Sequence, residues 1–291
     1  AIADRYRCQP YSDYRRMLDE QKPEAVTIAV PTIFHREVAL EVIDRGIHLL
    51  IEKPIAYKVE EAEEIIAAAE AADVRLMVGH IERFNPAVEA LKQRLMEGEL
   101  GRVFQIDARR QGPFPARVQD VGVVIDLAVH DLDIIRYITQ AEVTRLYAET
   151  ERRIHSVHED LLNGLARLED GTVCTLTINW LTPTKIRELW VTGERGMFRV
   201  DYLTQDLYFF ENATVSSGQW DTLRVLRGVS EGQMIRYVVR KKEPLRAELQ
   251  AFLAAVAGVA QVAVTGKDGL KALSLAQAIV TSGLEHRVVE V

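Results

Sequence analysis

The chain has 291 residues, of which 48% are hydrophobic and 27% charged, and its formal net charge is -7 at pH 7. This length suits one large or two medium domains, and the positive charges are too scattered to form the basic stripe that nucleic-acid binding requires. No apolar run reaches the roughly 18 residues of a membrane helix, so we expect a small-molecule substrate and neither nucleic acid nor membrane as a partner.

Cys8 and Cys174 are the only cysteines. They are too few and too far apart to predict a disulfide framework or a metal site, and this usage fits a reducing cytoplasm. The chain opens with Ala1 and shows no basic-then-apolar signal sequence. The absence of an initiator methionine suggests that the true beginning has been lost or processed.

Apolar strand patterns alternate with helical patterns over the first 80 residues. Residues 1–7 fit either the end of a helix or a fragment of strand, and residues 8–11 fit a short strand, but the pattern decides neither. Ser12 is expected to cap a helix that runs to Glu20, because its hydroxyl accepts free backbone amides. The next elements are strands and helices in alternation, at 25–30, 34–45, 48–51, 59–72 and 75–79. Because the strands are apolar on both faces, the pattern predicts right-handed crossovers in a parallel sheet, and residues 1–82 form an incomplete nucleotide-binding α/β domain.

The pattern changes after residue 82, where strands with alternating faces become frequent. Helices are expected at 85–96 and 120–138, and strands at 103–108, 145–150, 161–168, 172–180, 187–192, 197–201 and 207–210. Two final helices are expected at 245–259 and 266–282, the second capped by Thr265. Residues 83–291 therefore form an α+β domain with a large, mostly antiparallel open sheet, and its C-terminal helices are able to pack back on the first domain.

Glu52, Lys53 and Pro54 directly follow the expected strand at 48–51. Ligands of α/β sheets bind outside the carboxyl ends of the strands, so a lysine at this point is able to reach a bound substrate. Pro54 has no amide proton and biases Lys53 toward an extended backbone. An ordinary corner between a strand and a loop is the alternative interpretation of these three residues alone.

The apolar segment at 123–138 carries Asp126, His130, Asp133 and Tyr137 at spacings of four, three and four. Side chains at these spacings share one stripe of a helix, and buried ionisable groups need partners or a polar cavity. Histidine suits proton removal from a hydroxyl near neutral pH, and a carboxylate one turn away fixes its tautomer, so His130 and Asp126 are a candidate base and orienter. The alternatives are a hydrogen-bonded interhelical network, or a metal pair that has no clear third ligand.

Three further sets of side chains are weaker candidates. In residues 79–86, Arg83 is able to clamp an anionic group and Asn85 to cap the next helix. A cluster at 155–159 offers His155, His158 and Glu159 to a metal, although we favour a solvated loop. Near the end of the expected sheet, Lys185 and Arg187 either meet a phosphate or cover one face, and the second interpretation suffices for these two taken alone.

The sequence contains no Gly-x-Gly-x-x-Gly. A dinucleotide-binding domain normally has this fingerprint between its first strand and helix, where the glycines let the backbone approach the pyrophosphate. Either the segment that carries it is missing from this chain, or a dinucleotide is not held in the usual way.

Four stretches together resemble the Gfo/Idh/MocA family of nicotinamide-dependent sugar oxidoreductases. They are Ala29-Val30-Pro31-Thr32 with His35, then Glu52-Lys53-Pro54, residues 79–86, and the spacing of Asp126, His130 and Asp133. The resemblance implies a Rossmann-type first domain, a second domain whose open sheet often makes the interface of a homodimer or homotetramer, and hydride transfer between NAD or NADP and a sugar carbinol carbon. Residues 79–86 and 179–202 look most like dehydrogenases of UDP-N-acetyl-hexosamines or their uronates.

The family pattern also implies roles for single residues. Lys53 stands beside the nicotinamide and the reacting hydroxyl, and His130 is the acid or base with Asp126 nearby. The cofactor is lined by Lys53 with Pro31, Thr32, His35 and Glu52, and the expected substrate contacts are Arg83, Asn85 and Asp133. Ile81 stands where many members have asparagine, so that contact is not carried over, and no metal is expected.

Two rival functions follow from the same residues. A catalytically silent sugar-nucleotide binding or regulatory protein is favoured if the intact protein lacks the glycine loop. A lyase that uses Lys53 as a Schiff base, or a metal, is the other, which borohydride trapping or metal analysis would reveal.

Overall fold

The computed structural model describes residues 2–115, 118, 121–213 and 230–291 of a chain that divides into two compact units. The first unit comprises Ala1–Gly79 and Ala251–Leu270, and the second comprises His80–Gln250 and Lys271–Val291. The predicted boundary at residue 82 falls close to the observed change at Gly79. Residues 251–270 belong to the first unit, although the sequence assigned them to the second domain.

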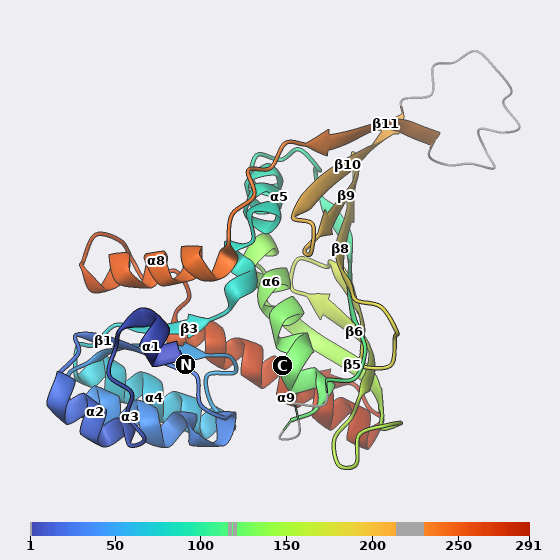
Figure 1. Ribbon diagram of the computed structural model, residues 1–291. Coiled ribbons are helices and arrows are strands. Elements are labelled where there is room, and N and C mark those ends of the chain that lie inside the picture. The colour runs from blue at the N-terminus through green and yellow to red at the C-terminus, as the bar shows by residue number, and fades with distance from the viewer. Residues whose placement is uncertain (1, 116–117, 119–120, 214–229) are drawn as a thin grey trace, which may run out of the picture. The chain divides into compact units, whose positions relative to one another are not determined.

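The first unit contains a three-stranded parallel sheet of order β1-β2-β3 (Figure 1). Its elements are α1 (Ile2–Tyr6), α2 (Tyr14–Gln21), β1 (Ala25–Ile28), the 3₁₀ turn η1 (Thr32–Phe34), α3 (His35–Asp44), β2 (His48–Glu52), α4 (Val59–Ala71) and β3 (Leu76–Gly79). The three strands run in the same direction, so their carboxyl ends lie at one edge of the sheet. This is the parallel α/β arrangement that the sequence predicts.

The middle strand of this sheet, β2, is buried on both faces. Leu49, Leu50 and Ile51 are each no more than 1% exposed, as expected for a parallel strand that is covered on both faces.

The backbone of α9 (Gly266–Glu285) closely approaches β3, and Gly269 near the start of this helix is the point of approach. A Cβ added there would lie 2.8 Å from a methyl group of Val78, so only glycine lets the helix backbone approach β3 so closely.

Asp13 caps α2, and the prediction of Ser12 was wrong by one residue. Its carboxylate accepts hydrogen bonds from the backbone N–H groups of Arg15 and Arg16, at 2.9 and 3.5 Å. A carboxylate suits this position because it is both an acceptor and a negative charge at the positive end of the helix. Of the two undecided segments near the start of the chain, the first contains the helix α1 and residues 8–11 contain no strand.

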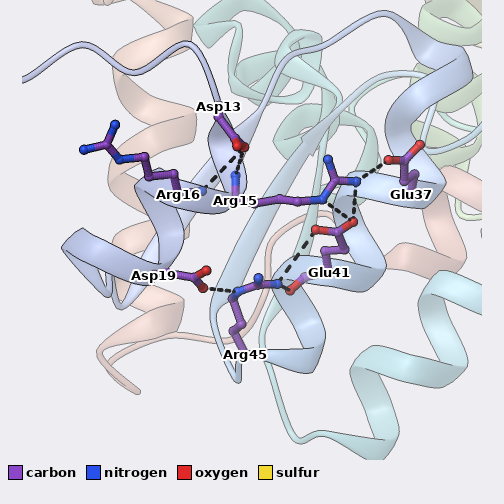
Figure 2. A network of polar contacts seen from close by, with 7 residues as sticks. All are labelled: Asp13, Arg15, Arg16, Asp19, Glu37, Glu41 and Arg45. Atoms are coloured by element: carbon purple, nitrogen blue, oxygen red, sulfur yellow. Dashed lines mark hydrogen bonds and ion pairs between the residues drawn. The ribbon is translucent and has the colours of Figure 1, made fainter.

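An ion-pair network joins α2 to α3 on the surface of the first unit (Figure 2). Nη2 of Arg15 lies 2.6 Å from both Glu37 and Glu41. Arg45 extends the network, because its Nε lies 2.9 Å from Asp19 and its Nη1 lies 3.9 Å from Glu41. The network links the exposed faces of two helices, and each charged group drawn in it has a partner among the described residues, so we assign it a structural role.

The second unit contains a nine-stranded sheet of order β11-β10-β9-β8-β4-β7-β6-β5-β12 (Figure 1). Its elements are η2 (Ile81–Phe84), α5 (Pro86–Met96), β4 (Val103–Gln111), the π-helix η3 (Val124–Ala128), α6 (Val129–Thr139), β5 (Val143–Glu151), β6 (Leu161–Leu168), β7 (Val173–Asn179), β8 (Ile186–Gly193), β9 (Gly196–Asp201), β10 (Asp206–Ala213), β11 (Ser230–Tyr237) and β12 (Val289–Glu290). Two helices, α8 (Pro244–Val256) and α9, belong partly to each unit.

The sheet of the second unit has one covered face and one open face. The helices α5 and α6 pack together over the covered face (Figure 1), where Ile106, Ala108, Leu189 and Val191 are fully buried. Side chains that point to the other face are mostly half-exposed. Every pairing is antiparallel except that of β4 with β7, so the prediction of a mostly antiparallel sheet is confirmed.

Three predictions about the second unit need correction. The long helix expected at 120–138 is divided into η3 and α6, and its expected start at Asp120 lies outside the described residues. Strands β11 and β12 were not predicted, and β4 extends to Gln111 rather than to residue 108.

In the part of the chain that the structure describes, no helix is both long enough and apolar enough to cross a membrane.

Candidate active site

Glu52, Lys53 and Pro54 lie at the carboxyl end of β2, in the middle of the parallel sheet. Glu52 is in register with Gly79 on β3, and a Cβ added to Gly79 would lie 3.2 Å from Oε2 of Glu52. The carboxylate therefore packs over the end of β3. Lys53 then leaves the strand through a cis peptide bond to Pro54. This lysine lies where ligands of parallel sheets bind, as the sequence predicts.

The imidazole of His35 joins the loops that follow β1 and β2. Its Nδ1 lies 2.9 Å from the carbonyl oxygen of Pro54, and its Nε2 lies 2.9 Å from that of Val30. The ring is 1% exposed, and burial lowers its pKa against the opposing effect of the two carbonyls. Pro31 beside it is exposed and Thr32 is buried. His35 thus fixes the loop that carries Lys53, and any effect on a cofactor acts through that loop.

Asp126 belongs to the π-helix η3, and His130 lies in the first turn of α6. π-helical turns are rare and occur often at functional sites. Their wider turn also means that the single stripe predicted from α-helical spacing does not continue unchanged through Asp126. Both side chains are half-buried, so part of each remains exposed.

Glu159 holds the start of this segment from the loop before β6. Its backbone oxygen accepts the N–H of Val123 at 2.9 Å, and its carboxylate accepts the N–H of Val124 at 3.1 Å. A Cβ added to Gly122 would lie 2.0 Å from that carboxylate. Glycine at 122 is therefore what admits Glu159 to the free amides that open the helix.

Arg83 and Asp133 form a buried, two-pronged ion pair within the second unit. Nε and Nη2 of Arg83 lie 2.8 and 2.6 Å from the two carboxylate oxygens, and the side chains are 8% and 1% exposed. The guanidinium also lies 4.8 Å from the ring centre of Tyr137, and Nδ1 of His80 lies 3.9 Å from Asp133. The structure therefore brings together two predicted substrate residues, with most of their charge neutralised internally.

Asn85, the third predicted substrate residue, is 2% exposed. Its Oδ1 accepts the N–H of Ala87 at 3.1 Å, which confirms the predicted cap of α5. Its Nδ2 donates to the backbone oxygen of Tyr202 at 3.1 Å. Both polar atoms are thus used to fix α5 against the end of β9.

A second buried ion pair, between Arg110 and Asp131, was not predicted. Nε and Nη2 of Arg110 lie 2.7 and 3.0 Å from the Asp131 carboxylate, and Nη1 lies 2.8 Å from Glu82. Although burial opposes it, the two carboxylates raise the pKa of Arg110. Burial also raises the pKa of the Tyr202 hydroxyl well above its usual range. Arg110 shares its strand face with the buried Ile106 and Ala108, and this alternation is the sequence signal that would have found it.

The cluster at 155–159 does not form a metal site. His155 is 7% exposed, and its Nδ1 accepts the N–H groups of Val157 and His158 at 3.0 and 2.9 Å. The carboxylate of Glu159 accepts the N–H of Val124 at the start of η3. Within the described ranges, no group of three histidine, cysteine or acidic side chains is arranged to hold a metal ion.

Two sequence profiles of one family match consecutive parts of the chain. Residues 1–80 match the oxidoreductase family with an NAD-binding Rossmann fold, and residues 88–199 match the GFO/IDH/MocA C-terminal domain. The chain belongs to the Gfo/Idh/MocA family. The resemblance drawn from short motifs is thereby confirmed, as are the oxidoreductase class and the nicotinamide cofactor.

Similar proteins span nearly the whole chain. A UDP-N-acetylglucosamine 3-dehydrogenase from Acidithiobacillus ferrooxidans is 29% identical over 275 residues, which are 94% of this chain and 83% of that protein. A solved structure of that enzyme superposes with a TM-score of 0.83 at 28% identity, covering 97% of this chain and 85% of that one. A myo-inositol 2-dehydrogenase from Thermotoga maritima is 26% identical over 290 residues, covering 96% and 83%. A levoglucosan dehydrogenase solved with NADH and levoglucosan shares the fold, with a TM-score of 0.83 at 22% identity, covering 100% and 86%.

The first unit of this Gfo/Idh/MocA protein fits a nicotinamide cofactor at the carboxyl edge of its sheet. Val30 and Ile33, which follow β1, are 37% and 53% exposed, and such an apolar border suits the face of a flat ring. Glu52 and Lys53 follow the adjacent strand. The glycine fingerprint that normally meets the pyrophosphate does not occur among the residues of the printed sequence.

Proposed function

We propose that this chain is an NAD- or NADP-dependent dehydrogenase that oxidises a hydroxyl-bearing carbon of a nucleotide sugar. The observation that carries the proposal is the position of Lys53 at the carboxyl end of the middle strand of an NAD-binding parallel sheet. The similarity to a UDP-N-acetylglucosamine 3-dehydrogenase along 94% of the chain supports the substrate. That substrate is a UDP-N-acetyl-hexosamine or its uronate, with oxidation at C3.

In this proposal His130 removes the proton from the substrate hydroxyl, and Asp126 holds the imidazole in the required orientation. An imidazole is suited to this step because it titrates near neutral pH. The ammonium group of Lys53 stabilises the negative charge that develops on the alkoxide oxygen. When bound, the nicotinamide cofactor supplies the hydride acceptor.

The other predicted site residues take supporting roles. Pro31, Thr32 and Glu52 line the cofactor, and His35 fixes the loop that carries Lys53. For the substrate contacts we propose an indirect role, because the ion pair of Arg83 with Asp133 and the two hydrogen bonds of Asn85 already use the polar atoms of those side chains.

We also propose that the enzyme is a homodimer or homotetramer that pairs through the open face of the large sheet. Leu165 and Met234, on different strands of that face, are 49% and 63% exposed, and apolar side chains exposed on a sheet face favour association. Light scattering would measure the oligomeric state, and a monomer at micromolar concentration would contradict this proposal.

The cytoplasm is the proposed compartment, because Cys8 and Cys174 are both free thiols.

The test is a titration with NAD(H) and NADP(H), followed by a screen of UDP-sugars for formation of reduced nicotinamide. Lys53→Ala and His130→Ala should each abolish turnover, while His158→Ala should retain it. Circular dichroism would check that each variant is folded. Turnover near wild type in either active-site variant would contradict the assignment. A silent binding protein would bind sugar without reducing the cofactor, and a Schiff-base lyase would be inactivated by borohydride only with its substrate present.

A further inference from the structure

A half-buried arginine without a salt bridge lies at one end of the large sheet. Arg187 is the second residue of β8, and it shares the covered face with the buried Leu189 and Val191. Its Nη1 donates to the backbone oxygens of Gln111 and Ile186, at 2.5 and 3.0 Å. Among the described residues, no carboxylate oxygen lies within 4.0 Å of its guanidinium. Nε and Nη2 therefore remain as donors for a ligand.

The charges around Arg187 make this position costly. The strand register places it directly opposite Arg110 on β4, and like charges in that arrangement repel. The nearby carboxylates of Asp131 and Glu82 are bonded to Arg110 instead. Burial and the facing Arg110 lower the pKa of Arg187, against the opposing effect of the Asp131, Glu82 and Asp126 carboxylates. A half-buried cation that contacts no carboxylate of the described residues is stabilised when an anion binds it.

Lys185 precedes Arg187 by two residues and lies just before β8. The side chains of both residues approach Gly112, directly after β4. A Cβ at that glycine would lie 3.6 Å from Cγ of Lys185 and 3.9 Å from both Nη atoms of Arg187. Asp126 is among the charges that act on Arg187, so this pair of cations belongs to the same part of the second unit as the candidate orienter.

We infer that Lys185 and Arg187 bind an anionic oxygen group of the substrate. The inference rests on the proposed function, in which two groups have this chemistry: the diphosphate of a nucleotide sugar and the carboxylate of a uronate. The planar guanidinium of Arg187 presents parallel N–H donors to either group, and the ammonium of Lys185 adds a movable point charge. A role as a solvated surface residue does not explain why Arg187 faces inward opposite another arginine, Arg110.

The experiment compares Arg187→Gln, Arg187→Lys and Lys185→Gln with a matched control, Arg195→Gln. Arg195 lies in the turn at the other end of β8, where its Nη1 donates to the backbone oxygen of Gly98 at 3.1 Å. Loss of a charge-assisted pair of hydrogen bonds should raise the KM for UDP-N-acetylglucosamine about 10- to 100-fold for Arg187→Gln. Arg187→Lys should recover part of this, the KM for NAD should stay unchanged, and Arg195→Gln should match the wild type.

Calorimetric binding of UDP, and of glucuronate, to the same proteins distinguishes the two anions without relying on turnover. Loss of UDP affinity in Arg187→Gln identifies the diphosphate, and loss of glucuronate affinity alone identifies the carboxylate. UDP binding to the wild type should also weaken with added salt. Affinities for both anions that do not depend on Arg187 overturn the inference. If UDP binding depends on Arg187 but no sugar reduces NAD or NADP, the proposed function fails and the anion site stands.

Discussion

Replacing Asp133 with asparagine should strongly destabilise the second unit. The side chain keeps its volume, so the change removes the charge without opening a cavity. Arg83 is 8% exposed, and it would keep a buried charge that has lost its two-pronged partner. Breaking a buried pair from one side costs roughly 3–5 kcal/mol. Because the Tyr137 ring 4.8 Å away still attracts the guanidinium, we expect the lower end of that range, about 3 kcal/mol.

Urea unfolding followed by tryptophan fluorescence would measure this loss. All three tryptophans lie between residues 180 and 220, so the signal reports on the second unit. The double variant Arg83→Met with Asp133→Leu should lose less than Asp133→Asn, because it leaves no unpaired charge. Glu89→Gln is the control, since it breaks an exposed pair with Lys242 that is worth about 1 kcal/mol or less. A loss below about 1 kcal/mol for Asp133→Asn would refute the buried-pair argument.

Three further changes test other parts of the structure. Because burial lowers the pKa of His35 below its ordinary 6.5, its contribution to stability is present above pH 6.5 and lost as pH falls through the folded value. The melting temperature of the wild type should therefore fall faster than that of His35→Gln on acidification, and parallel profiles would contradict this. Gly122→Ala should lower kcat by about tenfold or more in steady-state assays, because its Cβ displaces Glu159 from the start of η3; an unchanged kcat would show that this contact does not position the site. Iodoacetamide at pH 8 should label Cys8 but not Cys174 in the folded protein by mass spectrometry, since burial raises the pKa of Cys174 to about 12; label on Cys174 before unfolding would count against its burial.

Elements with strong local signals were predicted from the sequence. Strand β6 has the predicted bounds, Leu161–Leu168, because its pattern stops at the turn residues Glu169, Asp170 and Gly171. The helix α5 also begins where expected, since Asn85 and Pro86 together specify a start. These features depend on residues that are neighbours in the chain, so a single sequence contains the information.

Features that depend on distant residues were not predicted. Strand β11 contains Gly232 and mostly polar residues and gains its partner, β10, only after the chain returns to the sheet edge. The parallel pairing of β4 with β7 joins segments that are far apart in sequence. The π-helical turns of η3 depend on Glu159, a residue of a later loop, and on the space left by Gly122. Each of these requires the assembled fold.

The functional residues of the candidate site show the same distinction between local motifs and contacts that depend on distant residues. Lys53 and His130 were found because their motifs are short and local. Arg110 was missed, because its partners Asp131 and Glu82 come from other elements. Arg187 was noticed, but its inward direction and its position opposite Arg110 become evident only from the strand register.

The most direct test of the central claim follows the transferred hydrogen. The enzyme would be incubated with NAD and UDP-N-acetylglucosamine carrying deuterium at C3, and the reduced cofactor analysed by mass spectrometry. We predict that the deuterium appears in the reduced nicotinamide with the wild type, and that His130→Ala forms no labelled cofactor. Deuterium released to water, or a reduced cofactor without label, would contradict hydride transfer from this carbon.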